Sequence, residues 1–101
     1  MKTKELIREF CQEGLVHGSA SNGRLRVIQD VDFTVLVNYK TPIAIRDRVG
    51  GVILNTNHYS ATTTKHQNRV RDYAEELIEE EDEQEFWKVL HLQEEIKDFS
   101  L

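Results

Sequence analysis

The feature that most constrains the fold is a change in the spacing of apolar residues along the chain. After a turn-rich segment at residues 18–23, the apolar period changes from about 3.6, the period of a helix, to about 2, the period of a strand. The alternation is clearest over Phe33–Tyr39, where every second residue is apolar or aromatic. Helical spacing returns near residue 62. This order of helix, strands and helix predicts an α+β fold.

Four strands are expected in the middle of the chain. They are Arg24–Ile28, Phe33–Tyr39, Ile43–Arg46 and Val52–Thr56. Their connections are short, so an antiparallel meander is the expected topology. Phe33 and Tyr39 share one strand face, and we expect both rings to belong to the core.

Helical segments are expected on both sides of these strands. The first begins with Thr3 as its cap and ends at Gly14, with Cys11 packed in its apolar stripe. A long second helix takes its cap from Thr62–Thr64 and ends near the acidic run Glu79–Glu83. The last helix carries Phe86, Val89, Leu90, Gln93 and Ile96 on one face, and this stripe is mainly apolar.

These elements predict one α+β domain over residues 1–101. An N-terminal helix precedes the four-stranded antiparallel meander, and two C-terminal helices pack on one sheet face. A chain of 101 residues is large enough for a single core. Cys11 is the only cysteine, so no internal disulfide is possible and a reducing compartment is expected. No apolar run approaches the roughly 20 residues that span a bilayer, so we expect a soluble, cytoplasmic protein without membrane partners.

Charge is divided unevenly along the sequence. Residues 1–73 contain 11 Lys or Arg and 7 Asp or Glu, which gives a net charge of +4. Residues 74–101 contain 2 and 11, which gives −9. Such a division is typical of a basic surface for nucleic acid, of an acidic surface that imitates nucleic acid, or of an ordinary solvated helix face rich in glutamate.

The basic side of this division is concentrated in Tyr59–Arg71, which combines hydroxyl and cationic side chains without an acidic residue. The start of a helix presents free N–H groups and partial positive charge, so this segment suits an anion such as phosphate. The residues expected to bind phosphate or nucleic acid are Lys65, His66, Arg69, Arg71, Arg46 and Arg48. A solvated basic surface without a ligand is the alternative, with His66 as a packed residue.

The acidic side suggests a contact with a protein. Carboxylates satisfy the same arginines as phosphates do, so they suit the basic channel of a nucleic-acid-processing protein. Trp87 is adjacent to the last apolar stripe and is a candidate interface residue. The expected partner-binding residues are Glu75, Glu76, Glu79, Glu80, Asp82, Glu83 and Trp87.

The sequence has no recognisable catalytic or metal-binding motif. It lacks a glycine-rich phosphate loop and the Gly-x-Ser-x-Gly and His-Glu-x-x-His patterns. The four histidines match no metal-ligand spacing. We therefore expect a protein without catalytic residues, metal or cofactor. The enzymatic alternative is a small hydrolase-type site at Tyr59, Ser60 and His66, for which no orienting acid is evident.

Two stretches of the sequence are distinctive beyond these patterns. Residues 37–46, VNYKTPIAIR, and residues 51–68, GVILNTNHYSATTTKHQN, carry the patterns S/N-Y-x-T-x-I-A and L-N-T-x-x-Y-S-x-T-T-S/T-K/R-H-Q-N. They resemble a small family of proteins carried by phages and mobile elements. The resemblance implies a prokaryotic viral or plasmid setting, and hence the host bacterial cytoplasm, and it implies no particular activity.

In that setting the leading hypothesis is a non-enzymatic interaction protein. It would bind a host nucleic-acid-processing protein or nucleoprotein, as an anti-CRISPR or anti-restriction inhibitor does. The competing hypothesis is a nucleic-acid-binding module that uses the basic start of the long helix. The sequence leaves the oligomeric state open.

Overall fold

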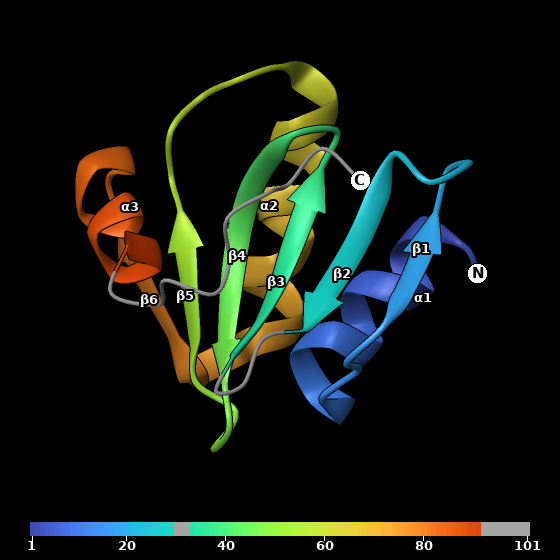
Figure 1. The fold of residues 1–101 in the computed structure, drawn as a ribbon, viewed down its shortest axis with the longest axis horizontal. Coiled ribbons are helices and arrows are strands. Elements are labelled where there is room, and N and C mark those ends of the chain that lie inside the picture. Colours follow the sequence, from blue (N-terminus) through green and yellow to red (C-terminus); the bar gives the residue numbers. More distant parts are fainter. Residues whose placement is uncertain (30–32, 92–101) are drawn as a thin grey trace.

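The computed structural model describes residues 1–29 and 33–91 (Figure 1). Its helical elements are α1 (Thr3–Arg8), the π-helical turn η1 (Glu9–Glu13), α2 (Ala61–Ala74), the short 3-10 turn η2 (Glu75–Leu77) and α3 (Glu83–His91). Its strands are β1 (Gly18–Ala20), β2 (Leu25–Gln29), β3 (Phe33–Asn38), β4 (Thr41–Asp47), β5 (Val52–Asn55) and β6 (Ile78–Glu81). The α+β class expected from the sequence is therefore confirmed.

One sheet contains all six described strands in the order β1-β2-β3-β4-β5-β6. The first five are antiparallel neighbours, as the short connections predict. β6 is parallel to β5, and α2 forms the crossover between them. The expected four-strand meander was incomplete, because Gly18–Ala20 and Ile78–Glu81 also form strands.

Helices cover both faces of the sheet. α1, η1 and α2 contribute to one apolar cluster, which includes Leu36, Ala44 and Leu54. α3 contributes Phe86 and Leu90 to a second cluster on the other face. In Figure 1, α2 lies behind the sheet. The prediction that both C-terminal helices share one face is wrong, because the central strands are apolar on both sides and each side needs a cover.

The sixth strand replaces the last turns of the expected long helix. α2 ends at Ala74, and Ile78–Glu81 then pairs with β5. A continued helix would place Glu75 near Glu79 and Glu76 near Glu80, and like charges four residues apart destabilise a helix. An extended strand removes this repulsion between neighbouring turns and gives the backbone new hydrogen bonds with β5.

The N-terminal helix agrees with the sequence in its core and differs at its start. Cys11 is buried, and Gly14 ends the helical segment with a φ of 66°, as expected. A Cβ at Gly14 would lie 2.9 Å from Nη1 of Arg46, the far end of a flexible side chain, so the positive φ rather than space is the reason for glycine. The cap position is Lys2 rather than Thr3, whose hydroxyl contacts that of Ser21 at 2.8 Å.

The two aromatic residues predicted for the core have different environments. Phe33 is partly buried and packs against the second cluster. Tyr39 lies beyond the end of β3, and its exposed fraction is 58%. The prediction of a core Tyr39 is therefore wrong. The strand ends at Asn38, so the alternation that appeared to include Tyr39 stops one residue earlier.

Candidate functional site

The hydroxyl residues of the Tyr59–Arg71 segment build the start of α2. Ser60 is the N-cap, and its Oγ accepts a hydrogen bond from the backbone N–H of Thr63 at 3.1 Å. The sequence predicted a hydroxyl cap but placed it two to four residues too late, at Thr62–Thr64. Thr63 is buried, and its Oγ1 accepts a hydrogen bond from Asn38 Nδ2 at 3.0 Å. Thr64 Oγ1 donates to the carbonyl of Ser60.

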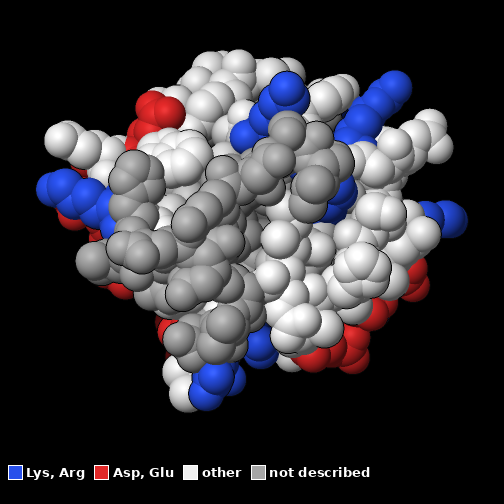
Figure 2. Space-filling view, in the orientation of Figure 1, with Lys and Arg blue, Asp and Glu red and all other residues white. Residues whose placement is uncertain are grey.

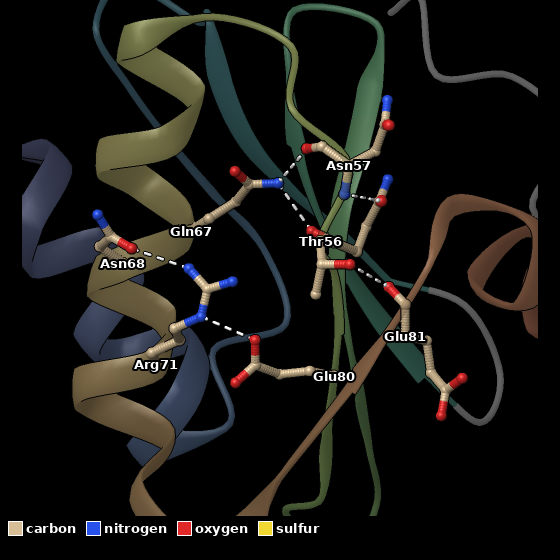
Figure 3. A network of polar contacts seen from close by, with 8 residues as sticks. Thr56, Asn57, Gln67, Asn68, Arg71, Glu80 and Glu81 are labelled. Atoms are coloured by element: carbon tan, nitrogen blue, oxygen red, sulfur yellow. Dashed lines mark hydrogen bonds and ion pairs between the residues drawn. The ribbon is translucent and has the colours of Figure 1, made fainter.

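Amide side chains tie the β5–α2 connection to the helix that follows it. Gln67 is buried on α2, and its Nε2 donates to the carbonyls of Asn55 and Asn57 at 2.7 and 2.9 Å (Figure 3). The side chain of Asn55 donates to the carbonyl of Pro42 and to the hydroxyl of Tyr59. The N–H of Asn57 in turn donates to Asn55 Oδ1 at 3.0 Å. This network fixes the path of the chain between β5 and α2.

Two further contacts join this connection to the acidic end of β6. Thr56 donates both its backbone N–H and its hydroxyl to the carbonyl of Glu81, each at 3.0 Å (Figure 3). The Tyr59 hydroxyl donates to Glu83 Oε1 at 3.2 Å. Burial raises the pKa of Tyr59 above its usual range, so the phenol keeps the proton that it donates. The distinctive 55–68 segment thus uses most of its polar side chains for hydrogen bonds within the fold.

The expected basic residues occupy two ends of α2. Lys65 is exposed near the helix start, and Arg69 lies one turn later on the same side. Arg46 lies near the other end, where its Nε donates to the carbonyl of Cys11 at 3.3 Å. It shares a cleft of about 460 Å³ with Ala74, which lies about 14 Å along the helix axis from Lys65. The structure does not bring these cations together.

The remaining expected cations, Arg48 and Arg71, do not join Lys65 and Arg69 at the start of α2. Arg48 lies in the turn between β4 and β5, close in the chain to Arg46. Arg71 is on the flank of α2 that faces β6, and its Nε donates to Glu80 Oε1 at 2.9 Å (Figure 3). Its Nη1 also donates to Asn68 Oδ1 at 2.8 Å. A carboxylate of the acidic segment therefore neutralises one member of the expected phosphate site.

His66 is buried on the core side of α2, with an exposed fraction of 6%. Its Nδ1 has no hydrogen-bond partner among the described residues. Burial lowers the pKa of His66 below its usual range, and the positive charge of Arg69 lowers it further. The imidazole is therefore neutral at pH 7, which does not favour a direct ionic contact with phosphate.

The three residues of the hydrolase-type alternative are engaged separately. The Ser60 hydroxyl contacts the backbone N–H and Oγ1 of Thr63, at 3.1 and 3.0 Å. The Tyr59 hydroxyl lies between Asn55 and Glu83. His66 contacts neither hydroxyl through a hydrogen bond in the described structure.

The acidic residues are distributed over both faces of β6. Leu54 pairs with Glu80, so Glu80 points to the face covered by α2. Glu79 and Glu81 point to the opposite face, toward α3. Asp82 caps α3 by accepting a hydrogen bond from the N–H of Glu85 at 2.9 Å. Glu75 and Glu76 lie in η2, at the far end of β6.

Four carboxylates on the α3 side form what we name the acidic edge: Glu79, Glu81, Asp82 and Glu85. The pKa of Glu81 is raised, first by a hydrogen bond with the side chain of Glu79, then by desolvation and by the negative charges of Glu79, Glu85 and Asp82. The sequence had not singled out Glu81 or Glu85. One signal points to Glu81 once β6 is known to be a strand, which is the two-residue alternation from Glu79. Glu85 lies in the first turn of α3, where its N–H binds the capping residue Asp82.

Trp87 and Lys88 complete the surroundings of the acidic edge on α3. Trp87 is half-buried and packs against the second apolar cluster. Lys88 Nζ lies 3.0 Å from Glu85 Oε1.

No group of three or more His, Cys, Asp or Glu in the described ranges has a geometry that could hold a metal ion. None of the described helices is both long enough and apolar enough to cross a membrane.

The chain belongs to the family of unknown function DUF8033, whose family model matches residues 10–88. The matched range contains all six described strands together with α2. No curated protein and no solved structure matches the chain.

Proposed function

We propose that this member of the family is a non-enzymatic interaction protein that binds a basic surface of a host nucleic-acid-processing protein through the acidic edge. In the phage or mobile-element setting implied by the resemblance of residues 37–46 and 51–68, such binding would block access of nucleic acid to the partner and would act against host defence. The observation that carries the proposal is the placement of four carboxylates on one side of β6 and the start of α3, where their negative charges raise the pKa of Glu81.

Like charges at this spacing repel one another, so the acidic edge opposes folding at neutral pH. The repulsion is concentrated on one face, because the carboxylate on the other face of β6, Glu80, is paired with Arg71. Lys88 forms an ion pair with Glu85, whereas the ion pairs found between described residues include neither Glu79 nor Glu81. A partner arginine placed between those two carboxylates would replace repulsion with charge-assisted hydrogen bonds.

The position of the edge also suits a protein contact. β6 is the last strand of the described sheet, so its glutamates are at the side of the molecule rather than in the middle of a covered face. Trp87 supports the neighbouring surface because its ring packs against the second cluster. An aromatic side chain beside a charged rim is typical of protein interfaces.

The test compares two charge-matched double variants. Glu79→Gln with Glu81→Gln removes two charges from the acidic edge, and Glu5→Gln with Glu13→Gln removes two charges from exposed positions on α1 and η1. Proteins captured from a bacterial lysate are identified, and the dissociation constant of each purified basic partner is measured at two salt concentrations. We expect the edge variant to weaken binding and to reduce its salt dependence, whereas the control keeps both.

Stability and nucleic-acid protection complete the experiment. The edge variant should keep or raise the melting temperature, because it removes repulsion, so weaker binding would not reflect unfolding. If the partner is a nuclease, the wild-type protein should protect its target and the edge variant should protect it less. Equal affinities for the edge variant and the wild type at both salt concentrations would refute the proposal.

A further inference from the structure

A strained tyrosine occupies the turn between β3 and β4. Tyr39 and Lys40 form the two-residue loop of this hairpin. Tyr39 has a φ of 58°, and Lys40 has no positive φ. A positive φ at the first loop position alone is the pattern of a type II′ turn, in which glycine is preferred at that position. A bulky side chain is uncommon in this conformation, because its Cβ crowds the backbone.

Packing does not account for Tyr39. Its exposed fraction is 58%, so the side chain is not enclosed in the core, and its hydroxyl has no hydrogen bond with a described residue. Its backbone is firmly held instead: the N–H donates to the carbonyl of Arg24 at 2.6 Å, and the carbonyl accepts from Arg26 Nη2 at 2.7 Å. A single exposed aromatic residue is ordinary on a surface. An exposed aromatic residue in a position that favours glycine points to a role outside folding.

Hydrogen bonds bring four segments together at this end of the sheet. The contact between Tyr39 and Arg24 joins the β3–β4 turn to the start of β2. The side chains of Thr3 and Ser21 join the start of α1 to the β1–β2 turn. Asn38 and Thr63 join the end of β3 to the first turn of α2. We name the surface formed by residues 1–5, 21–24, 39–40 and 60–65 the hairpin end.

The hairpin end is strongly basic. Its only acidic residue is Glu5, whereas its cations are Lys2, Lys4, Arg24, Lys40 and Lys65. All five cations are exposed, and none forms an ion pair with a described residue. Lys and Arg side chains lie along the upper centre and upper right in Figure 2, near the start of β2 and the end of β3 in Figure 1. Acidic atoms on the same view lie mainly along other parts of the rim.

We infer that the hairpin end binds single-stranded nucleic acid, with an unpaired base stacked on the ring of Tyr39 and phosphates bound by Arg24 and Lys40. Every base presents a flat face to an aromatic ring, and cations beside the ring follow the backbone of the strand. A duplex keeps its bases stacked inside and offers no face to Tyr39. An acidic protein would use the cations but would not need the aromatic ring in a strained loop.

The hairpin end shares Lys65 with the site expected at the start of α2, but it binds nucleic acid through Tyr39, Arg24 and Lys40 in place of Arg46, Arg48 and Arg71. It does not depend on the acidic edge, which lies on β6 and α3. A nucleoprotein partner would be contacted by both surfaces, with its protein on the acidic edge and its nucleic acid on the hairpin end.

The test measures fluorescence anisotropy of labelled 12-nucleotide oligothymidine and oligouridine with the full chain, at low and moderate salt. We expect binding that weakens as salt rises. Tyr39→Gly should keep or raise the melting temperature, because it places the preferred residue in the turn, and should weaken binding roughly five- to 100-fold. Tyr39→Phe should bind as the wild type does. The oligonucleotide that binds more tightly identifies DNA or RNA as the ligand.

Charge variants separate the site from general attraction. Arg24→Gln with Lys40→Gln should weaken binding and reduce its salt dependence. The control, Arg8→Gln with Lys88→Gln, removes the same charge from cations that are paired with glutamates elsewhere, and should bind as the wild type does. If Tyr39→Gly does not fold, Tyr39→Leu removes the aromatic face and keeps an apolar side chain in its place.

The inference is overturned by no binding of either oligonucleotide at low salt, by equal binding of the glycine or leucine variant and the wild type, or by equally tight binding of a blunt duplex. Binding of polyglutamate without binding of oligonucleotides would also overturn it and would assign the surface to an acidic protein. The hairpin-end variants should keep the protein contacts of the acidic edge, so this inference and the proposed function fail separately.

Discussion

Arg71 on α2 and Glu80 on β6 form an ion pair, with 2.9 Å between Nε of the arginine and Oε1 of the glutamate. The sequence pattern assigned these two residues to surfaces of opposite charge. The crossover from β5 through α2 to β6 brings them side by side, because β6 is parallel to β5 and α2 packs against the same face. The division of charge along the sequence is therefore only partly a division in space.

The ion pair should contribute little to stability. Both side chains are partly exposed, so Arg71→Gln should lower the free energy of unfolding by about 1 kcal/mol or less. Urea denaturation of the two single variants and of the double variant with Glu80→Gln measures the coupling between them. A loss above about 2 kcal/mol for Arg71→Gln would show that the pair fixes the β6 strand more firmly than its exposure implies.

The amide of Gln67 should be far more important than this surface pair. Gln67→Glu keeps the shape but removes the N–H groups that bind the carbonyls of Asn55 and Asn57. We expect a loss of about 2 kcal/mol or more at pH 7, because a buried carboxylate would face two carbonyl oxygens. The loss should shrink at acidic pH, where a protonated carboxyl group donates one hydrogen bond.

The matched control for this substitution is Gln29→Glu, which makes the same change at an exposed position at the end of β2. Thermal denaturation at pH 7 and at pH near 4 compares the two variants. Equal stability of Gln67→Glu and Gln29→Glu at neutral pH would show that the β5–α2 connection does not need the Gln67 amide.

The cap of α2 gives a third prediction. Ser60→Ala removes the oxygen that accepts from the N–H of Thr63, and should lower the free energy of unfolding by about 1 kcal/mol. Ser19→Ala changes an exposed serine on β1 and should have almost no effect. Chemical denaturation measures the free energy of unfolding of both variants. If Ser60→Ala is as stable as the wild type, another residue caps α2.

The buried imidazole predicts a loss of stability at acidic pH. The folded-state pKa of His66 is below 6.5, so the fold binds fewer protons at this position than the unfolded chain does. Its contribution to stability is present above about pH 6.5 and is lost as the pH falls toward the folded-state pKa. His66→Gln should therefore reduce the dependence of the free energy of unfolding on pH in this range.

The histidine experiment uses His17→Gln as its control, because His17 is exposed. Free energies of unfolding are measured between about pH 7 and pH 5.5, above the range in which most carboxylates titrate. Glu81 acts with the opposite sign, since its raised pKa favours the fold as the pH falls, so the comparison is made between variants. An unchanged pH dependence in His66→Gln would assign the effect to other groups.

Sequence periodicity predicted several of the local elements, but neither β1 nor β6. The alternation in Phe33–Asn38 and the helical stripe through Leu6 and Phe10 depend on neighbours in the chain, and both elements are present. The hydroxyl-rich start of α2 was also recognisable, although the cap is Ser60 rather than a later threonine. The residue types did not predict the positive φ of Tyr39, because a position with positive φ favours glycine and is rarely occupied by tyrosine.

The sequence alone thus determined the α+β class, the central antiparallel strands and the start of α2, because side chains near one another in the chain set these features. Only the tertiary structure decided that Ile78–Glu81 is a strand, that α3 covers the second sheet face, and which charges are neutralised. Strand pairing and ion pairing join residues far apart in the sequence, and their energies depend on which distant residues the fold places in contact. No local pattern contains that information.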